Sequence, residues 1–165
     1  MNTSSRLALL RSLLLLAAVG GLGFRPIAMS EVEAEDNVAI GGYDAVAYFT
    51  RGEPTRGRAI LRVEWQGALW YFANRRHQRL FEANPDQYAP AYGGFCAFCI
   101  ADSETAPTNG DPEVFLIHED RLYLLQSEAV KREWMQDLEG HTARARAVYA
   151  GLVTIAERAG DAEQE

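Results

Sequence analysis

The chain has 165 residues, of which 48% are hydrophobic and 24% are charged, and its formal net charge is −7. This length is enough for one ordinary domain with its own hydrophobic core. The acidic balance argues against nucleic acids and anionic membrane surfaces as partners, because both select surfaces rich in lysine and arginine.

A leucine-rich stretch near the amino terminus has the layout of a secretory signal. Arg6 and Arg11 precede the uncharged segment 12–24, and small residues follow its leucines. This segment is shorter than the roughly 20 apolar residues that a membrane-spanning helix needs. We therefore expect residues 1–28 to be a signal peptide and the protein to be periplasmic or secreted. An uncleaved membrane anchor and a buried amino-terminal helix are the alternatives. Removal of the signal would take three arginines and no acidic residue, which leaves a net charge of −10.

Residues 29–37 are expected to be an acidic linker, followed by one domain over 38–159 and a frayed tail at 160–165. The elements expected in chain order are short apolar runs at 38–40 and 45–49, a hairpin pairing 60–65 with 69–72, a helix over 74–83, a second hairpin pairing 114–117 with 122–125, and helices over 127–138 and 142–159. Turn residues and helix caps at the boundaries support this order. It predicts a small single α+β domain, built from short antiparallel hairpins, a central short helix and carboxy-terminal helices.

Two segments of the domain match a family pattern. One is Gly-Tyr-Asp-Ala-Val-Ala-Tyr-Phe at 42–49, and the other runs from Trp-Tyr-Phe-Ala-Asn at 70–74 to Tyr-Gly-Gly-Phe-Cys-Ala at 92–97. Together they resemble the YHS-domain family, in its exported bacterial branch of small stand-alone proteins. The resemblance covers about residues 38–150. It implies the family's fold and a link to metals, but no activity for this branch.

The chain departs from the metal-linked members of that family at three positions. Ala47, Ala73 and His77 stand where those members have cysteines, and thiolates are what select soft metals. The resemblance therefore does not imply their soft-metal site. Cys96 fits the pattern of the exported branch, whereas Cys99 stands where that branch usually has a small residue.

Both cysteines of the chain lie in one Cys-x-x-Cys motif, which leaves three interpretations open. Cys96 and Cys99 can be a structural thiol pair or disulfide, as an oxidising compartment favours. They can bind zinc or copper with His77 as a third ligand. They can also be a redox couple, because such short bridges are reducible. The metal interpretation predicts that His77 faces inward from its helix toward the Gly93-Gly94 loop, so that the three side chains converge.

The remaining candidates point to structural roles. Asp44 is expected to accept backbone N–H bonds at the Gly41-Gly42 turn, while His118 is expected at a solvated hairpin tip and His141 in a linker. Nine aromatic residues are expected in the core, with a small aromatic ligand pocket as the alternative: Tyr43, Tyr48, Trp65, Trp70, Tyr71, Tyr88, Tyr92, Phe95 and Phe98.

Motifs for phosphate loops, nucleophile elbows and zinc proteases are absent from the sequence. We therefore expect a metal-binding accessory module that uses zinc or copper, rather than an enzyme. The alternatives are a thiol–disulfide redox protein and a metal-free ligand-binding or interaction domain.

Overall fold

The computed structural model describes residues 38–102 and 106–162. The expected signal peptide at 1–28, the acidic linker at 29–37 and the last residues of the tail, 163–165, lie outside the described residues. Across the described ranges, no helix combines the length and the apolar character needed to cross a membrane.

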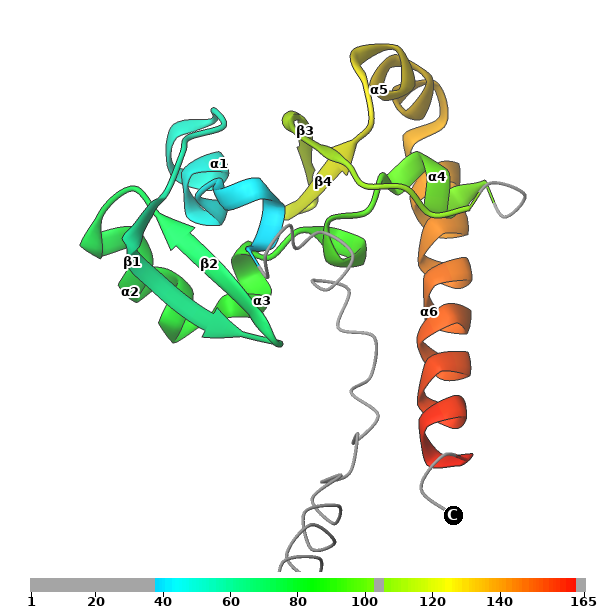
Figure 1. Cartoon of the computed structure of the whole chain (residues 1–165). Helices are drawn as coiled ribbons and strands as arrows, with labels where there is room; N and C mark the ends of the chain where they lie inside the picture. Colours follow the sequence, from blue (N-terminus) through cyan, green and yellow to red (C-terminus); the bar gives the residue numbers. More distant parts are fainter. Residues whose placement is uncertain (1–37, 103–105, 163–165) are drawn as a thin grey trace, which may run out of the picture.

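The elements follow one another in the order η2 (Ala39–Gly42), α1 (Ala45–Arg51), β1 (Arg58–Trp65), β2 (Ala68–Phe72), α2 (Arg75–Ala83), α3 (Pro85–Tyr88), η3 (Ala91–Gly94), α4 (Ala97–Ala101), β3 (Asp111–His118), β4 (Arg121–Leu125), α5 (Glu128–Trp134), η4 (Met135–Asp137) and α6 (Leu138–Ala162). The strands form two separate antiparallel pairs, β1–β2 and β3–β4 (Figure 1). The predicted α+β class is therefore confirmed.

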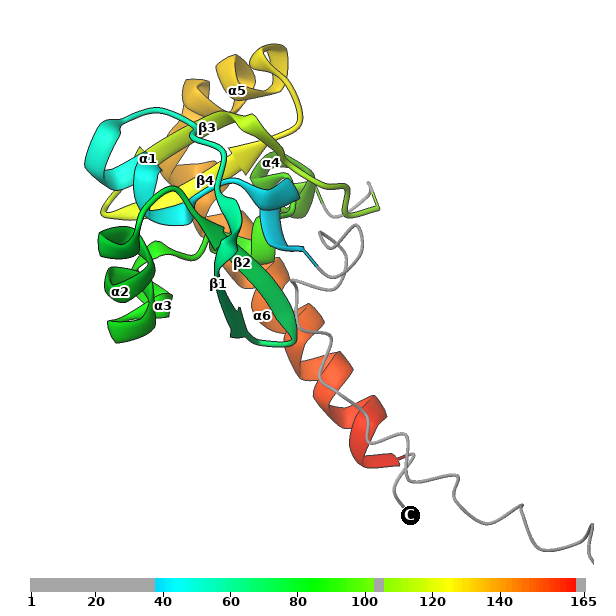
Figure 2. The same cartoon turned by 60° about the vertical axis from the view of Figure 1, so that its left-hand side comes forward.

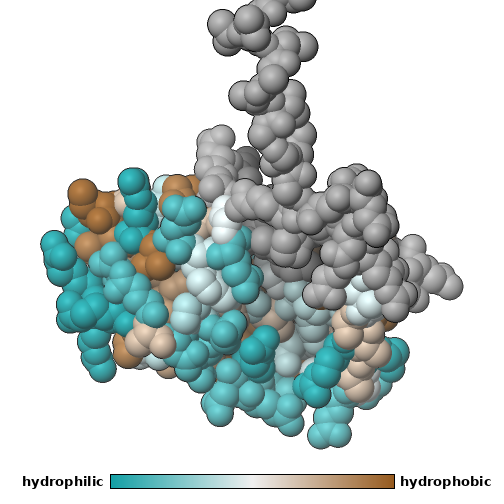
Figure 3. Space-filling view, turned by 90° about the horizontal axis from the view of Figure 1, so that it is seen from below, coloured by the Kyte–Doolittle hydropathy of each residue, from teal (hydrophilic) through white to brown (hydrophobic). Residues whose placement is uncertain are grey.

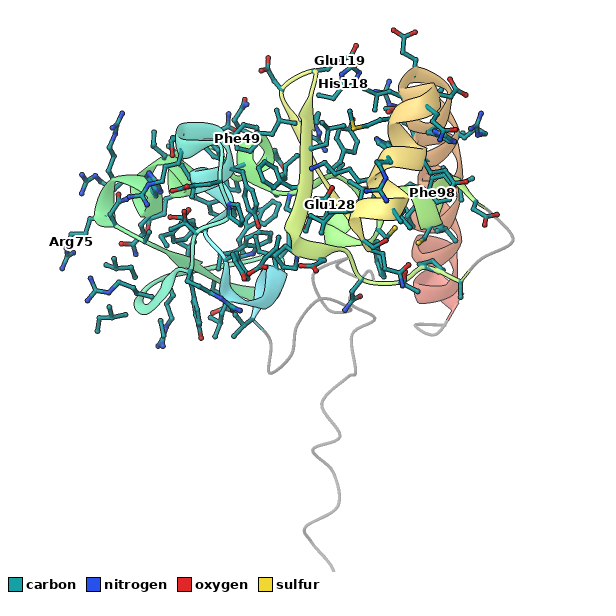
Figure 4. All side chains as sticks on the ribbon, turned by 90° about the horizontal axis from the view of Figure 1, so that it is seen from above. Phe49, Arg75, Phe98, His118, Glu119 and Glu128 are labelled. Carbon is teal, nitrogen blue, oxygen red and sulfur yellow. The ribbon has the colours of Figure 1, made fainter. Side chains whose placement is uncertain are left out.

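Both predicted hairpins are present, and their turns explain their register. Gln66 and Gly67 have φ values of 49° and 79°, as a two-residue turn with the twist of the flanking strands requires. The second hairpin also turns in two residues, Glu119 and Asp120, with φ values of 48° and 55°. His118 is thereby drawn into β3, although it still lies at the free tip of the hairpin (Figure 4).

Helices α2 and α5 begin at the predicted caps. The side-chain oxygen of Asn74 accepts a hydrogen bond from the backbone N–H of His77 at 2.9 Å. The hydroxyl of Ser127 accepts one from the N–H of Val130 at 3.3 Å. These bonds satisfy amides that have no partner within the first helical turn.

Two segments differ from the expectation. Residues 45–49 belong to α1 rather than to an extended run, because Asp44 caps a helix there. The expected helices 127–138 and 142–159 leave residues 139–141 between them, but Gly140 lies inside α6, where its N–H donates to the carboxylate of Asp137 at 3.1 Å. Helix α6 starts at Leu138 and continues to Ala162, so residues 160–162 are helical and not part of a tail.

The core consists of two clusters that share the β3–β4 hairpin. The first cluster gathers side chains from η2, α1, β1, β2 and α2, and the second gathers side chains from η3, α4, α5 and α6. Alternate residues of the hairpin face opposite clusters: Phe115, Ile117, Leu122 and Leu124 pack on the first, and Val114, Leu116, Tyr123 and Leu125 pack on the second. Figures 1 and 2 show the hairpin between these two halves. This two-stranded sheet is therefore covered on both faces.

Candidate functional site

The two cysteines lie at the start of α4 with their thiols facing each other. Cys96 is the N-cap of the helix, and its Sγ accepts a hydrogen bond from the N–H of Cys99 at 3.4 Å. The two Sγ atoms are 2.8 Å apart, and the pair is present as free thiols. Both side chains are buried, with exposed fractions of 0% for Cys96 and 5% for Cys99. The motif is thus folded into a compact helical turn.

Backbone bonds from a neighbouring segment hold this dithiol in place. The N–H of Cys96 donates to the carbonyl of Thr108 at 2.8 Å, and the N–H of Gly110 donates to the carbonyl of Gly94 at 3.0 Å. Cys96 also forms a parallel bridge with Leu124 of β4. The dithiol therefore rests against the shared hairpin, on the side of the second cluster.

Two polar side chains form hydrogen bonds with the dithiol, both at Cys99. The hydroxyl of Thr108 donates to Cys99 Sγ at 3.3 Å, and Cys99 Sγ donates to Oε1 of Gln126 at 3.7 Å. Burial raises the pKa of the Cys96 thiol to about 11, and the side-chain hydrogen bond with the Cys99 thiol acts in the same direction, whereas the backbone N–H of Cys99 opposes it. Because a thiolate and not a thiol is the nucleophile, Cys96 is a weak nucleophile at neutral pH.

His77 faces inward, but it does not join the cysteines. The residue is 5% exposed, with Nδ1 2.7 Å from Oδ2 of Asp44 and Nε2 3.2 Å from the hydroxyl of Thr50. Within the part of the chain that the structure describes, no three His, Cys, Asp or Glu side chains are grouped closely enough to hold a metal ion. The expected convergence of His77, Cys96 and Cys99 is therefore not found. The reason is that a buried carboxylate already binds the imidazole.

For Asp44, the sequence predicted a structural role but not its hydrogen-bond partners. Its carboxylate is fully buried, and Oδ1 accepts from the N–H groups of Val46 and Ala47 at 3.0 and 3.2 Å. Oδ2 accepts from the N–H of Ala73 at 2.8 Å and contacts the His77 ring. The predicted structural role is present, but the partners lie in α1, in α2 and just after β2 rather than at the Gly41-Gly42 turn. The missed signal was an aspartate directly before a helix-compatible Ala-Val-Ala run.

The other two histidines form no metal-binding group with the cysteines among the described residues. His118 occupies the hairpin tip beside Glu119 (Figure 4). His141 was expected in a linker but belongs to α6, where its ring stacks on Trp134 with centroids 5.5 Å apart. Its Nδ1 is 3.0 Å from the carbonyl of Trp134, and Phe98 packs edge-on against the same ring at 5.2 Å. His141 thus has a packing role in the second half of the domain.

Comparison of the chain with models of protein families, with curated proteins and with solved structures finds no match. The geometry of the dithiol and of the buried Asp44–His77 pair is therefore the basis for the functional argument.

Proposed function

We propose that this protein is an exported, YHS-like accessory domain whose Cys96–Cys99 pair is a thiol–disulfide couple. The observation that carries this proposal is the 2.8 Å distance between the two buried Sγ atoms. A disulfide bond joins sulfurs about 2.05 Å apart, so closure requires only a small movement within one helical turn. An oxidising compartment would supply the conditions for this reaction.

Cys99 is the more accessible thiol and is the one that attacks. Its thiolate displaces one thiol from a small-molecule or protein disulfide and forms a mixed disulfide with the other half. Cys96, once deprotonated, then attacks Cys99 Sγ and releases the second thiol. The incoming disulfide gains two electrons and two protons, and the dithiol becomes a disulfide. Since the pKa of Cys96 is raised, the second step is slow at neutral pH, which suits a redox-responsive element better than a rapid oxidoreductase.

Equilibration in buffers of defined dithiol-to-disulfide ratio tests this function. The mature protein should lose both free thiols in one two-electron transition, and the Cys96→Ser and Cys99→Ser variants should each keep one thiol or form a mixed disulfide. If both thiols stay free in the most oxidising buffer, under conditions that leave the protein folded, the couple does not exist.

A second candidate is binding of zinc or copper by the two thiolates. The two thiolates favour it, because zinc and copper(I) both bind cysteine sulfur. Thr108 Oγ1 and Gln126 Oε1 lie beside the sulfur of Cys99, but hydroxyl and amide oxygens are not usual ligands of either metal, so the other ligands would come from solvent. Titration of the reduced protein with zinc or copper(I) tests this function. Binding should disappear in Cys96→Ser and persist in His77→Asn, because His77 lies with Asp44.

Export is tested separately from the site. Protein recovered from the cell envelope should have an intact mass that lacks residues 1–28, as the arginines followed by a leucine core predict. A full-length cytoplasmic species would contradict export, and it would remove the compartment that favours the disulfide.

A further inference from the structure

A pocket lies where the two halves of the domain meet. It has a volume of about 180 Å³, and neither the cysteines nor His77 line it. Its lining includes Trp65 and Trp70 from the first hairpin, Tyr92 from η3 and Tyr149 from α6. Elements that are far apart in the sequence therefore build one cavity.

The aromatic walls of the pocket are fixed by contacts with one another. The Trp65 and Trp70 rings pack edge-on with centroids 5.7 Å apart, and Trp70 Nε1 donates to the carbonyl of Trp65 at 3.1 Å. The rings of Tyr92 and Tyr149, which also line the pocket, lie 5.2 Å apart. Trp70 and Tyr92 are buried, so their rings are held in place by the packing around them.

The backbone of Tyr92 is held in an uncommon conformation. Its φ of 58° lies in the left-handed region, which bulky residues rarely adopt. Strained residues of this kind collect at ligand-binding sites, where the surrounding structure enforces them. Here the strained residue presents its ring to the cavity.

The guanidinium of Arg121 lies at the edge of the pocket. Arg121 is exposed, and its Nη1 donates to the backbone carbonyl of Asp86 at 3.4 Å, which holds the guanidinium against the pocket rim. Burial raises the pKa values of Tyr92 and Tyr149 to about 12, so both phenols are neutral at physiological pH, and the positive charge of Arg121 opposes both shifts. The carboxylate of Asp86, also on the rim, can accept a hydrogen bond from a ligand hydroxyl or amino group.

We propose that this pocket binds a small aromatic carboxylate, with its ring between the tryptophan and tyrosine pairs and its carboxylate on Arg121. The volume supports a single ring, because a cavity of about 150 Å³ accommodates benzene. Aromatic walls favour a planar ring by stacking, and a guanidinium fork matches the two oxygens of a carboxylate.

Titration of the mature protein with benzoate and 4-hydroxybenzoate tests the proposal, with the fluorescence of Trp65 and Trp70 and the heat of binding as readouts. We expect saturable binding of both acids, with tighter binding of the hydroxylated acid because of Asp86. Benzamide, which has the ring without the charge, and acetate, which has the charge without the ring, should each bind at least about tenfold more weakly.

Two variants and a matched control distinguish binding in the pocket from nonspecific anion binding. Arg121→Gln should weaken benzoate binding at least about tenfold and leave benzamide binding unchanged, because an ionic bidentate contact is lost. Arg75→Gln is the matched control, since Arg75 points outward from α2 (Figure 4) and does not line the pocket. Tyr149→Leu, which removes one aromatic wall, should weaken both ligands.

Several outcomes would overturn the proposal. They are absence of benzoate binding at millimolar concentration, equal binding of benzamide and benzoate, and an equal effect of Arg75→Gln and Arg121→Gln. Far-UV circular dichroism of each variant verifies that it is folded, and Tyr149→Leu provides an independent test if Arg121→Gln does not fold.

Discussion

Asp44 shows how much of the first half depends on one carboxylate. Burial of an ionised carboxylate is costly unless donors replace its water. The N–H groups of Val46, Ala47 and Ala73 and the ring of His77 supply four such donors. The carboxylate thereby ties the start of α1 to the first turn of α2.

We predict that Asp44→Asn lowers the free energy of unfolding by about 2 kcal/mol. The charge-assisted hydrogen bonds are lost, and the side-chain NH2 group of the asparagine, itself a donor, would face N–H donors in place of a carboxylate oxygen. The control is Asp120→Asn, an exposed turn position where asparagine tolerates the left-handed backbone, and its effect should stay within about 0.5 kcal/mol. Urea denaturation followed by circular dichroism measures both. Equal stabilities of the two variants would contradict the bridging role of Asp44.

The raised pKa of Cys96 makes the stability of the reduced protein depend on pH in the alkaline range. Its folded-state pKa of about 11 lies above the ordinary thiol value, so the unfolded chain releases this proton at lower pH than the folded chain. The stability that Cys96 contributes is therefore fully present below about pH 8.5 and is lost as the pH rises toward 11.

We predict that the free energy of unfolding of the reduced protein falls between about pH 9 and 11, and that Cys96→Ala flattens this fall. Urea titrations at a series of pH values, in the presence of a reductant, measure the effect. Tyr92 and Tyr149 also have raised pKa values, so part of the decline above pH 10 should persist in the variant. An identical pH profile in both proteins would exclude the contribution of Cys96.

At the scale of elements, the loop before β3 packs closely against the dithiol segment and β4. A Cβ atom on Gly110 would lie 2.5 Å from Cβ of Leu124 and 3.0 Å from the carbonyl oxygen of Gly94. Neither neighbour is the end of a flexible side chain. The absence of a side chain at Gly110 therefore permits the contact that holds Thr108 against Cys96.

We predict that Gly110→Ala destabilises the domain by about 2 kcal/mol or more, since overpacking of a tight contact forces the backbone apart. The matched control is Gly151→Ala in α6, where an added Cβ meets no atom within 4 Å. That variant should gain up to about 1 kcal/mol from helix propensity. Thermal unfolding of both proteins gives the comparison, and a stable Gly110→Ala variant would mean that the loop can shift without cost.

The elements that could be predicted from sequence are those with local signals. The turn at Gln66-Gly67 and the caps Asn74 and Ser127 lie next to the structures that they determine. The apolar run 45–49 is compatible with a strand or a helix, and only the bonds of Asp44 decide for the helix. The inward direction of His77 was predictable from its helix, but its partner was not. Asp44 is 33 positions away, and no local pattern encodes that pairing.

At the scale of the whole molecule, the β3–β4 hairpin joins the two clusters into one cooperative unit. The β3–β4 hairpin contributes side chains to both clusters, because alternate residues face opposite sides. If one half unfolded and the hairpin with it, the other cluster would lose these packing contacts. A small domain with such a shared wall is expected to unfold in a single transition.

We predict that both halves unfold together. A Trp134→Phe variant reports on the first cluster through Trp65 and Trp70, and a Trp65→Phe, Trp70→Phe variant reports on the second through Trp134. In each variant, urea transitions followed by fluorescence and by far-UV circular dichroism should coincide. A fluorescence midpoint that departs from the circular dichroism midpoint in either variant would show that the halves are independent.

The shared hairpin also sets the order in which the chain can fold as it is made. Helices α1 and α2 and the β1–β2 pair are synthesised first, yet Leu122 and Leu124, which complete their core, come about 40 residues after Phe81. Until β4 has left the ribosome, the first half has an incomplete hydrophobic core. The first half is therefore expected to complete its folding only after most of the chain has been synthesised, which is compatible with the export proposed above.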